Sequence, residues 1–114
     1  MSAVTTHVLD LSTGRPAAGV EVHLDRLADT GEWSRLGEGE TDIDGRLRTL
    51  LAGNTPLATG TYRLVFGTGA YFSRLNVPTL YPHVTVVFNA SQSETHYHVP
   101  LLLSPYGYST YRGS

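Results

Sequence analysis

The chain has 114 residues, a net charge of −2 at pH 7, and neither cysteine nor lysine. The length predicts a single domain over residues 1–114. The composition excludes a disulfide framework, a thiolate metal site, a cysteine nucleophile and lysine Schiff-base chemistry, and the acidic balance offers no electrostatic basis for binding nucleic acid or an anionic membrane.

Short runs that alternate apolar and polar residues follow one another along the chain. Strands are expected at residues 4–11, 20–27, 33–36, 39–41, 46–51, 60–66, 83–90, 96–104 and 108–112. One short helix is expected at residues 70–75, where Asn76 and Pro78 stop it. The pattern predicts an all-β, antiparallel sandwich of about eight strands with one short helix.

The sequence carries no sign of an export signal or a membrane anchor. Residues 1–7 lack the charged and apolar stretches of a signal peptide. The longest apolar run falls far short of the ~20 residues that a spanning helix needs. A cytoplasmic protein with no membrane partner is therefore expected.

A turn that contains Asp42, Asp44 and Gly45 leads directly into Arg46. Acidic residues before a glycine are explained by side-chain hydrogen bonds and positive φ, and the Glu that ends an EF-hand calcium loop is absent. The turn would fix the guanidinium of Arg46, whose rigid fork of donors suits a planar, oxygen-rich or anionic ligand. The alternative is a solvated arginine at the end of a strand.

Histidines are the candidates for acid–base chemistry near neutral pH. His7 lies within the first strand, where a histidine is unusual. His96 and His98 are two residues apart and therefore point from one face of a strand. Either His7 and His98 converge on one pocket, or each is a hydrogen-bonded structural residue. His23 and His83 are expected to be ordinary surface or loop residues.

The run Leu101-Leu102-Leu103 places apolar side chains on both faces of its strand. One face can meet the other sheet, and the opposite face needs a second cover. Another copy of the chain would provide it, which predicts a homo-oligomer. The alternative is a cover made by the chain's own loops.

The C-terminal stretch holds Tyr106, Tyr108, Tyr111 and Arg112 and ends at Ser114. This composition is unusual because termini are commonly polar and frayed. Two interpretations are open. Either the Ser114 hydroxyl belongs to a polar site, or the tyrosines of a last strand pack at a subunit contact.

Motifs along the whole chain resemble those of one family. They are THVLD and GRPA near the start, TDIDGR at the turn, GTYR and GAYF in the centre, and HYHVPLLLSPYGYSTYRGS at the end. The sequence is similar to the transthyretin-related 5-hydroxyisourate hydrolases of urate breakdown. The terminal Tyr-Arg-Gly-Ser and the histidine pattern are the specific part, since transthyretin, the hormone carrier of the same fold, lacks them.

The resemblance implies a transthyretin-like β-sandwich that assembles as a homotetramer, a dimer of dimers, with active sites in the channel between dimers. The implied reaction converts a small molecule, 5-hydroxyisourate, to 2-oxo-4-hydroxy-4-carboxy-5-ureidoimidazoline, without a cofactor or a metal. The functional positions that the resemblance implies are His7, Arg46, His98, Tyr111, Arg112, Gly113 and Ser114, with His96 as a neighbour in the same motif.

These positions suggest a mechanism. Arg46 would clamp substrate oxygens and stabilise the charge that grows in the transition state. His7 or His98 would take a proton from water as general base, and the other would protonate the leaving nitrogen. Ser114 would hold the water or the second histidine. Substrate binding would fall to His7, Arg46, Tyr111, Arg112 and Gly113.

Two other functions remain open at this point. A ligand carrier of the transthyretin kind would use the same channel for a hydrophobic aromatic molecule, but the histidines and Arg46 make the expected channel polar. A zinc hydrolase would use His7, His96 and His98 as a three-histidine site. Each of these histidines would then need an acceptor for its other ring nitrogen.

Overall fold

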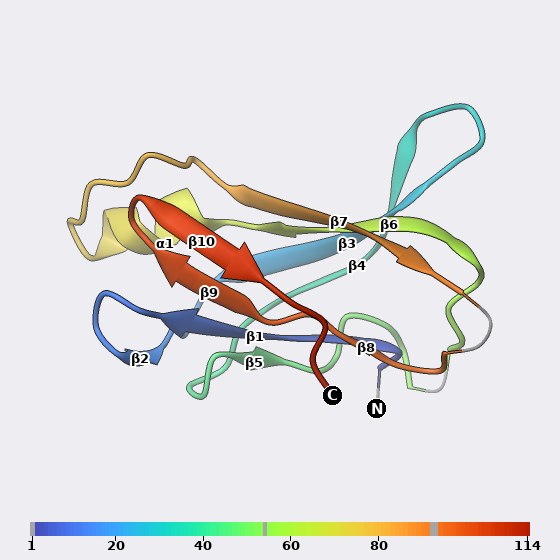
Figure 1. Ribbon diagram of the computed structural model, residues 1–114, viewed down its shortest axis with the longest axis horizontal. Coiled ribbons are helices and arrows are strands. Elements are labelled where there is room, and N and C mark those ends of the chain that lie inside the picture. The colour runs from blue at the N-terminus through green and yellow to red at the C-terminus, as the bar shows by residue number, and fades with distance from the viewer. Residues whose placement is uncertain (1, 54, 92–93) are drawn as a thin grey trace.

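The computed structural model describes residues 2–53, 55–91 and 94–114. Within them the chain forms ten strands and one short helix (Figure 1). In chain order they are β1 (Val4–Asp10), β2 (Arg15–Pro16), β3 (Glu21–Leu27), β4 (Trp33–Glu40), β5 (Arg46–Leu47), β6 (Gly60–Phe66), α1 (Thr68–Arg74), β7 (Val84–Ala90), β8 (Tyr97–His98), β9 (Leu101–Ser104) and β10 (Gly107–Thr110). No helix in this described part is long and apolar enough to cross a bilayer.

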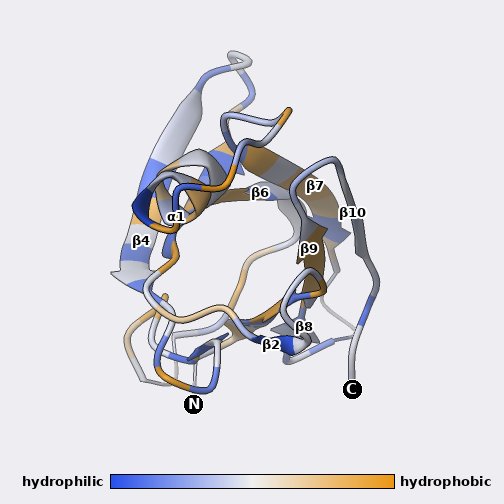
Figure 2. Ribbon diagram, turned by 90° about the vertical axis from the view of Figure 1, so that its left-hand side faces the viewer, coloured by the Kyte–Doolittle hydropathy of each residue, from blue (hydrophilic) through white to orange (hydrophobic). Residues whose placement is uncertain are grey.

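The strands form two sheets that face each other. One has the order β4-β3-β6-β7 and is antiparallel throughout. The other is built around β1, which pairs with β2, β5, β8 and β9, and ends at β10. Figure 2 shows β6 and β7 at the top of the molecule and β2 and β8 at the bottom. The expectation of an all-β sandwich with one short helix is confirmed.

The antiparallel expectation is wrong for two pairs of strands. β1 runs parallel to β8 and to β9. Parallel neighbours need a long crossover connection, and here the whole of the other sheet lies between β1 and β8 in the chain. The first strand is thus paired with strands from the end of the chain.

Three expected strands have different boundaries, and glycine and proline explain the differences. The segments expected at 33–36 and 39–41 are one strand, β4. A Cβ on Gly37 or Gly39 would collide with Leu50 or Leu47, so these glycines admit a close neighbour without interrupting the strand. The strand expected at 96–104 is divided into β8 and β9, because Pro100 between them has no N–H to donate.

The remaining differences are smaller. The strand expected at 46–51 is limited to Arg46–Leu47, and the one expected at 108–112 is Gly107–Thr110. The short strand Arg15–Pro16 occupies an expected turn. The helix begins earlier than expected, at Thr68, and the left-handed backbone of Asn76 (φ 58°) follows its end.

Alternating side chains from both sheets fill the space between them. Val4 and Val8 of β1, Leu101 of β9, and Leu64 and Phe66 of β6 are fully buried members of one hydrophobic core. Removing one such side chain from water contributes ~1.5–3 kcal/mol. The inward positions of β1 and β9 are therefore fixed by the core, and their alternate positions must face outward.

The outer face of the sheet around β1 carries side chains of mixed character. Thr5 and His7 lie there, because they alternate with the buried Val4 and Val8. Leu102 also lies there and is half-buried, between the buried Leu101 and Leu103. The leucine run thus presents apolar groups on both faces of its strand, as expected.

Candidate active site

Strand pairing on both sides of β1 brings residues from the two ends and the middle of the chain together. The parallel pair of β1 and β8 places Thr5 opposite His98. The antiparallel pair of β1 and β5 places His7 opposite Arg46. Directly opposed residues share a face of the sheet, so all four side chains lie on the outer face.

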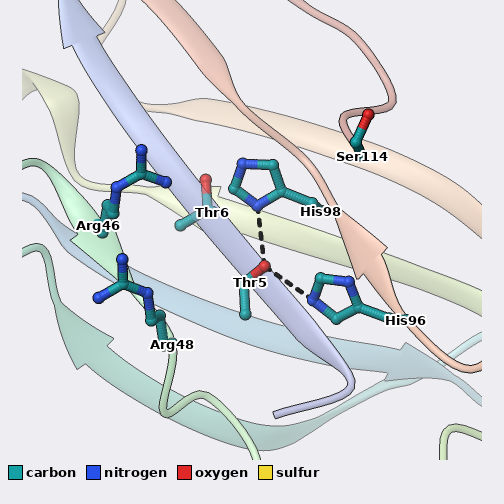
Figure 3. Close-up of a pocket in the computed structure, with 7 residues that line it drawn as sticks. All are labelled: Thr5, Thr6, Arg46, Arg48, His96, His98 and Ser114. Carbon is teal, nitrogen blue, oxygen red and sulfur yellow. Dashed lines mark hydrogen bonds between the residues drawn. The ribbon is translucent and has the colours of Figure 1, made fainter. Parts of the chain in front are cut away.

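A pocket of about 240 Å³ opens on this face. It is lined by Thr5, Thr6, Arg46, Arg48, His96, His98 and Ser114. Figure 3 shows the two arginines on one side of β1 and the two histidines on the other. Within the described residues, no carboxylate lies within ion-pair distance of Arg46 or Arg48. The pocket therefore presents two guanidinium groups that form no ion pair with the described residues, and the nearby Asp42 carboxylate acts on both only through longer-range electrostatics.

The hydroxyl of Thr5 connects the two histidines of the pocket. Its Oγ1 lies 2.8 Å from Nδ1 of His98 and 3.0 Å from Nε2 of His96. The two rings are nearly parallel, with centroids 6.5 Å apart and an interplanar angle of 14°. Thr5 carries a single hydroxyl proton, so with neutral rings it donates to one histidine and accepts from the other.

His98 is tuned toward its neutral form. Burial lowers the pKa of His98 below its usual value, and the positive charge of Arg46 lowers it further, followed by the charges of the other two site histidines. A neutral imidazole has one ring nitrogen free to accept a proton. His98 therefore has the protonation state that a general base needs near neutral pH.

His7 lies beside this pocket and outside its lining. Its Nε2 donates a hydrogen bond to the backbone carbonyl of Asp44 at 2.8 Å. A carbonyl can only accept, so Nε2 carries a proton and Nδ1 holds the lone pair of the neutral ring. The ring orientation of His7 is thus set by the same turn that precedes Arg46.

The turn before Arg46 is locked by its own side chain. Oδ1 of Asp42 accepts hydrogen bonds from the backbone N–H groups of Asp44 and Arg46, both at 2.9 Å. These two bonds, the one from Arg46 above all, lower the pKa of the Asp42 carboxyl. Gly45 has a φ of 76°, and its carbonyl accepts from the N–H of Val8 at 2.8 Å. Arg46 therefore starts its strand from a fixed position, as expected.

The C-terminal tetrapeptide is divided between two places. The N–H of Gly113 donates to the carbonyl of His98 at 2.8 Å, and a Cβ on Gly113 would lie 2.5 Å from Cδ2 of that ring. Only glycine fits this position without displacing His98. Ser114 lines the pocket, with its hydroxyl turned away from His98 in Figure 3.

The other two residues of the tetrapeptide lie outside the pocket. Tyr111 is exposed and lines a second, apolar hollow between β7 and β10, together with Phe88 and Val99. Arg112 forms an ion pair with Glu94 at 3.0 Å and covers the ring of Tyr97. In a single protomer, Tyr111 and Arg112 are thus not brought to the histidines.

The arrangement of the histidines differs from that of a zinc site. Nε2 of His96 and Nδ1 of His98 both face the hydroxyl of Thr5, and Nε2 of His7 faces a carbonyl. Among the described residues, no group of three or more histidine, aspartate or glutamate side chains converges as metal ligands would. The bonded nitrogens of the three histidines do not point at a common centre.

Three lining residues were not expected from the sequence: Thr5, Thr6 and Arg48. Arg48 follows Arg46 by two residues, and Thr5 precedes His7 by two. For Thr5 and Arg48, the alternation of side chains in the expected strands was the available signal. Thr6 faces the core, and no sequence pattern pointed to it. His23 and His83 lie outside this pocket, and His83 is exposed as expected.

The fold is a two-sheet sandwich, and histidines and two guanidinium groups without ion pairs in the described part of the chain gather on one of its outer faces. Together these features define a transthyretin-like protein with a polar site suited to acid–base chemistry. The chain belongs to the HIUase/Transthyretin family, which matches residues 4–113. A 5-hydroxyisourate hydrolase of Salmonella typhimurium is 50% identical over 111 residues, 97% of this chain and 80% of that protein.

Solved structures agree with this assignment. A 5-hydroxyisourate hydrolase from Klebsiella pneumoniae has a TM-score of 0.86 and 39% identity, covering 99% of this chain and 100% of that chain. Sea bream transthyretin in complex with thyroxine has a TM-score of 0.90 and 29% identity, covering 97% and 94%. The family, the transthyretin-like fold and the hydrolase class predicted from the sequence are confirmed. The roles of individual residues stay predictions.

Proposed function

We propose that the pocket on the outer face of β1 hydrolyses 5-hydroxyisourate to 2-oxo-4-hydroxy-4-carboxy-5-ureidoimidazoline. The observation that carries this proposal is the opposition of two arginines that form no ion pair among the described residues and two hydrogen-bonded histidines across β1. Relatives at about half identity are named for this activity. The fold alone does not decide function, because a hormone-binding transthyretin shares it.

Arg46 holds the substrate in this mechanism. The substrate is flat, acidic and rich in carbonyl oxygens, and a guanidinium offers it parallel hydrogen bonds. Arg48 adds a second cation on the same side of the pocket. Positive charge fixed beside the reacting carbonyl stabilises the oxyanion that forms when water attacks.

His98 acts as the general base and His7 as the general acid. The lowered pKa of His98 favours a neutral ring, which takes a proton from the attacking water. The water oxygen bonds to the carbonyl carbon, and the C–N bond of the cyclic amide then breaks. A protonated His7, with Nε2 held by Asp44, gives its Nδ1 proton to the leaving nitrogen.

The tail completes the site. Gly113 braces His98 through the backbone, and Ser114 lines the pocket, where rotation of its hydroxyl toward His98 would let it hold the water. Tyr111 and Arg112 belong to the proposed substrate-binding set through the assembled oligomer, since they face elsewhere in the protomer. Deletion of residues 111–114 should leave a folded oligomer with little activity, and full activity of that truncated protein would contradict this role.

The proposed assembly is a homotetramer, a dimer of dimers with the sites at subunit contacts. The half-buried Leu102 and the exposed Leu11 on the sheet around β1 would gain a cover. The edge strands β7 and β10 have one unpaired side each among the described strands. Sedimentation velocity tests the assembly, and a monomer at micromolar concentration would contradict it. The expected cytoplasmic location is kept and is testable by cell fractionation.

Ultraviolet spectroscopy tests the activity directly. Substrate is made fresh from urate with a urate oxidase, and its decay is followed with and without the protein. We expect the decay to accelerate strongly, with the same rate in the presence of a metal chelator. Decay at the uncatalysed rate would overturn the proposed function. Tight thyroxine binding without catalysis would instead favour the carrier.

A further inference from the structure

We infer that Thr5 is a positioning residue that fixes the proton of His98 on Nδ1 and links this ring to His96 as a proton relay. The inference rests on the proposed function, because it assigns a task to the ring that activates water. It gives roles to two residues, Thr5 and His96, for which the mechanism above has none.

The backbone of Thr5 is held firmly in the sheet. Thr5 lies in the middle strand of the site and is 4% exposed. Its carbonyl accepts a hydrogen bond from the N–H of Val99 at 2.9 Å. The hydroxyl therefore has a fixed origin, and both of its hydrogen-bond partners are ring nitrogens, at 2.8 and 3.0 Å.

The neighbouring threonine shows what a purely structural hydroxyl does here. Thr6 faces the core, is fully buried, and donates its proton to the backbone carbonyl of Val99 at 2.6 Å. Among the described residues, the hydroxyl of Thr5 has no such backbone acceptor and instead bridges two titratable rings. The link between the two histidines thus depends on one hydroxyl group.

The direction of the two hydrogen bonds follows from the task of His98. If Nε2 of His98 accepts the proton of water, Nδ1 must carry the proton of the neutral ring. Nδ1–H then donates to Oγ1 of Thr5, and the Thr5 hydroxyl donates to Nε2 of His96. In Figure 3, Nε2 of His98 lies on the ring edge turned away from Thr5, toward the side of Arg46.

The same chain of bonds can move charge after the water is deprotonated. His98 gains a proton at Nε2 and releases the one at Nδ1 to Oγ1 of Thr5. Thr5 passes its own hydroxyl proton to Nε2 of His96, so protons balance and the positive charge ends on His96. Figure 3 places His96 on the side of Thr5 away from both arginines. The shift therefore relieves repulsion between His98 and Arg46.

The test compares two substitutions of Thr5. Thr5→Val keeps the shape of the side chain and removes the hydroxyl, whereas Thr5→Ser keeps the hydroxyl. Thr61→Val, in the other sheet, is the matched control, because it removes an exposed threonine hydroxyl bonded to Asn89. The first measurement is ¹⁵N NMR of the histidine rings in substrate-free protein, and the second is the pH profile of kcat and KM.

We expect His98 to be the Nδ1–H tautomer in the native protein, in Thr5→Ser and in Thr61→Val. Thr5→Val should lose this preference and lower kcat by about 10- to 100-fold with little change in KM, because an orienting partner of a catalytic histidine is gone. His96→Asn should lower kcat by a similar factor. The double variant should fall no further, because both changes break one link.

The outcomes separate the relay from the proposed function. Retention of both the tautomer and kcat in Thr5→Val would overturn the relay, as would additive losses in the double variant. A native protein with the expected tautomer but no activity on 5-hydroxyisourate would overturn the proposed function and leave the hydroxyl link standing. Should Thr5→Val not fold, His96→Asn and Thr5→Ser decide the question.

Discussion

Both sheets carry a cluster of histidine and arginine on their outer faces, but the two clusters are built differently. On the sheet that contains β3, the buried Asp25 is surrounded by Arg63 at 2.6 Å, His23 at 3.4 Å and Arg35 at 3.9 Å. Arg63 also covers the ring of Trp33, 4.4 Å from its centroid. Every cation of that cluster is near the same carboxylate.

The pocket beside β1 has the opposite composition. Arg46 and Arg48 have no carboxylate within ion-pair distance in the described residues, and the two lining histidines share a neutral hydroxyl. Similar residue types thus form an internally ion-paired network on one sheet and a surface that can accept an anion on the other. The two clusters differ in whether a carboxylate lies in direct ion-pair contact with the cations.

The largest expected effect is on catalysis by His98. His98→Asn should lower kcat by ~10²–10⁴-fold, because general base catalysis contributes that much. The matched control is His23→Asn on the other sheet, which should keep the native rate. Kinetics with fresh substrate measure both. Equal rates for the two variants would remove the functional distinction between the faces.

A smaller effect is expected for the second arginine of the pocket. Arg48→Gln should raise KM by about tenfold, since a hydrogen bond between charged groups contributes ~1.5–3 kcal/mol. Arg35→Gln is the control from the other cluster and should leave KM unchanged. If Arg48→Gln binds substrate as well as the native protein does, Arg48 belongs to the solvated surface.

The pH dependence of kcat/KM should report the protonation of His98. Because the pKa of His98 is lowered, kcat/KM should rise with pH through a value below the usual ~6.5 of histidine. Arg46→Gln should move that His98 pKa upward, which NMR titration detects directly. A rate profile whose acid limb lies at or above the usual histidine value would contradict the assignment of His98 as base.

The free energy of unfolding should decrease as pH falls, because of one histidine on each outer face. Burial lowers the pKa of His23 as well as that of His98, so the unfolded chain binds more protons than the folded one as pH falls. The contribution of these two neutral histidines to the free energy of unfolding is fully present above the usual histidine pKa. It is lost as pH decreases through and below that value. Denaturation curves at pH 7 and pH 5 measure this loss, which both faces share.

The smallest effect on activity is expected from the most buried charge of the structural cluster. Asp25→Asn should lower the free energy of unfolding by about 2 kcal/mol, because the charge on the hydrogen bond from Arg63 and the ion pair with Arg35 are lost, and both arginines are partly exposed. It should not change kcat/KM of the folded protein. Urea denaturation and kinetics provide the two values, and a large fall in kcat/KM would show that the faces are coupled.

Local patterns predicted the parts of the site that depend on neighbouring residues. The turn that fixes Arg46 could be recognised because Asp42, Asp44 and Gly45 adjoin it, and alternation placed His96 and His98 on one face. The resemblance singled out His7, Arg46 and His98. Strand pairing places Arg46 opposite His7 and His98 opposite Thr5, two residues apart along β1.

Long-range pairing was beyond the reach of these patterns. The parallel pairing of β1 with β8 depends on the path of the long connection between them, which includes the whole of the other sheet. No short sequence motif predicts that path. For the same reason Thr5 was missed, because its importance comes from the register that sets it opposite His98. Gly37 looked like a strand break for a related reason, since Leu50, which packs against it, follows later in the chain.

The bond between Thr5 and His98 joins residues 93 positions apart. Closing so long a loop is entropically costly, and contacts of this separation form late when a chain folds. During synthesis, both β1 and β8 must have left the ribosome before the pocket can exist. Recovery of turnover after dilution from denaturant would therefore lag behind the return of secondary structure, so enzymatic output reports the final stage of refolding.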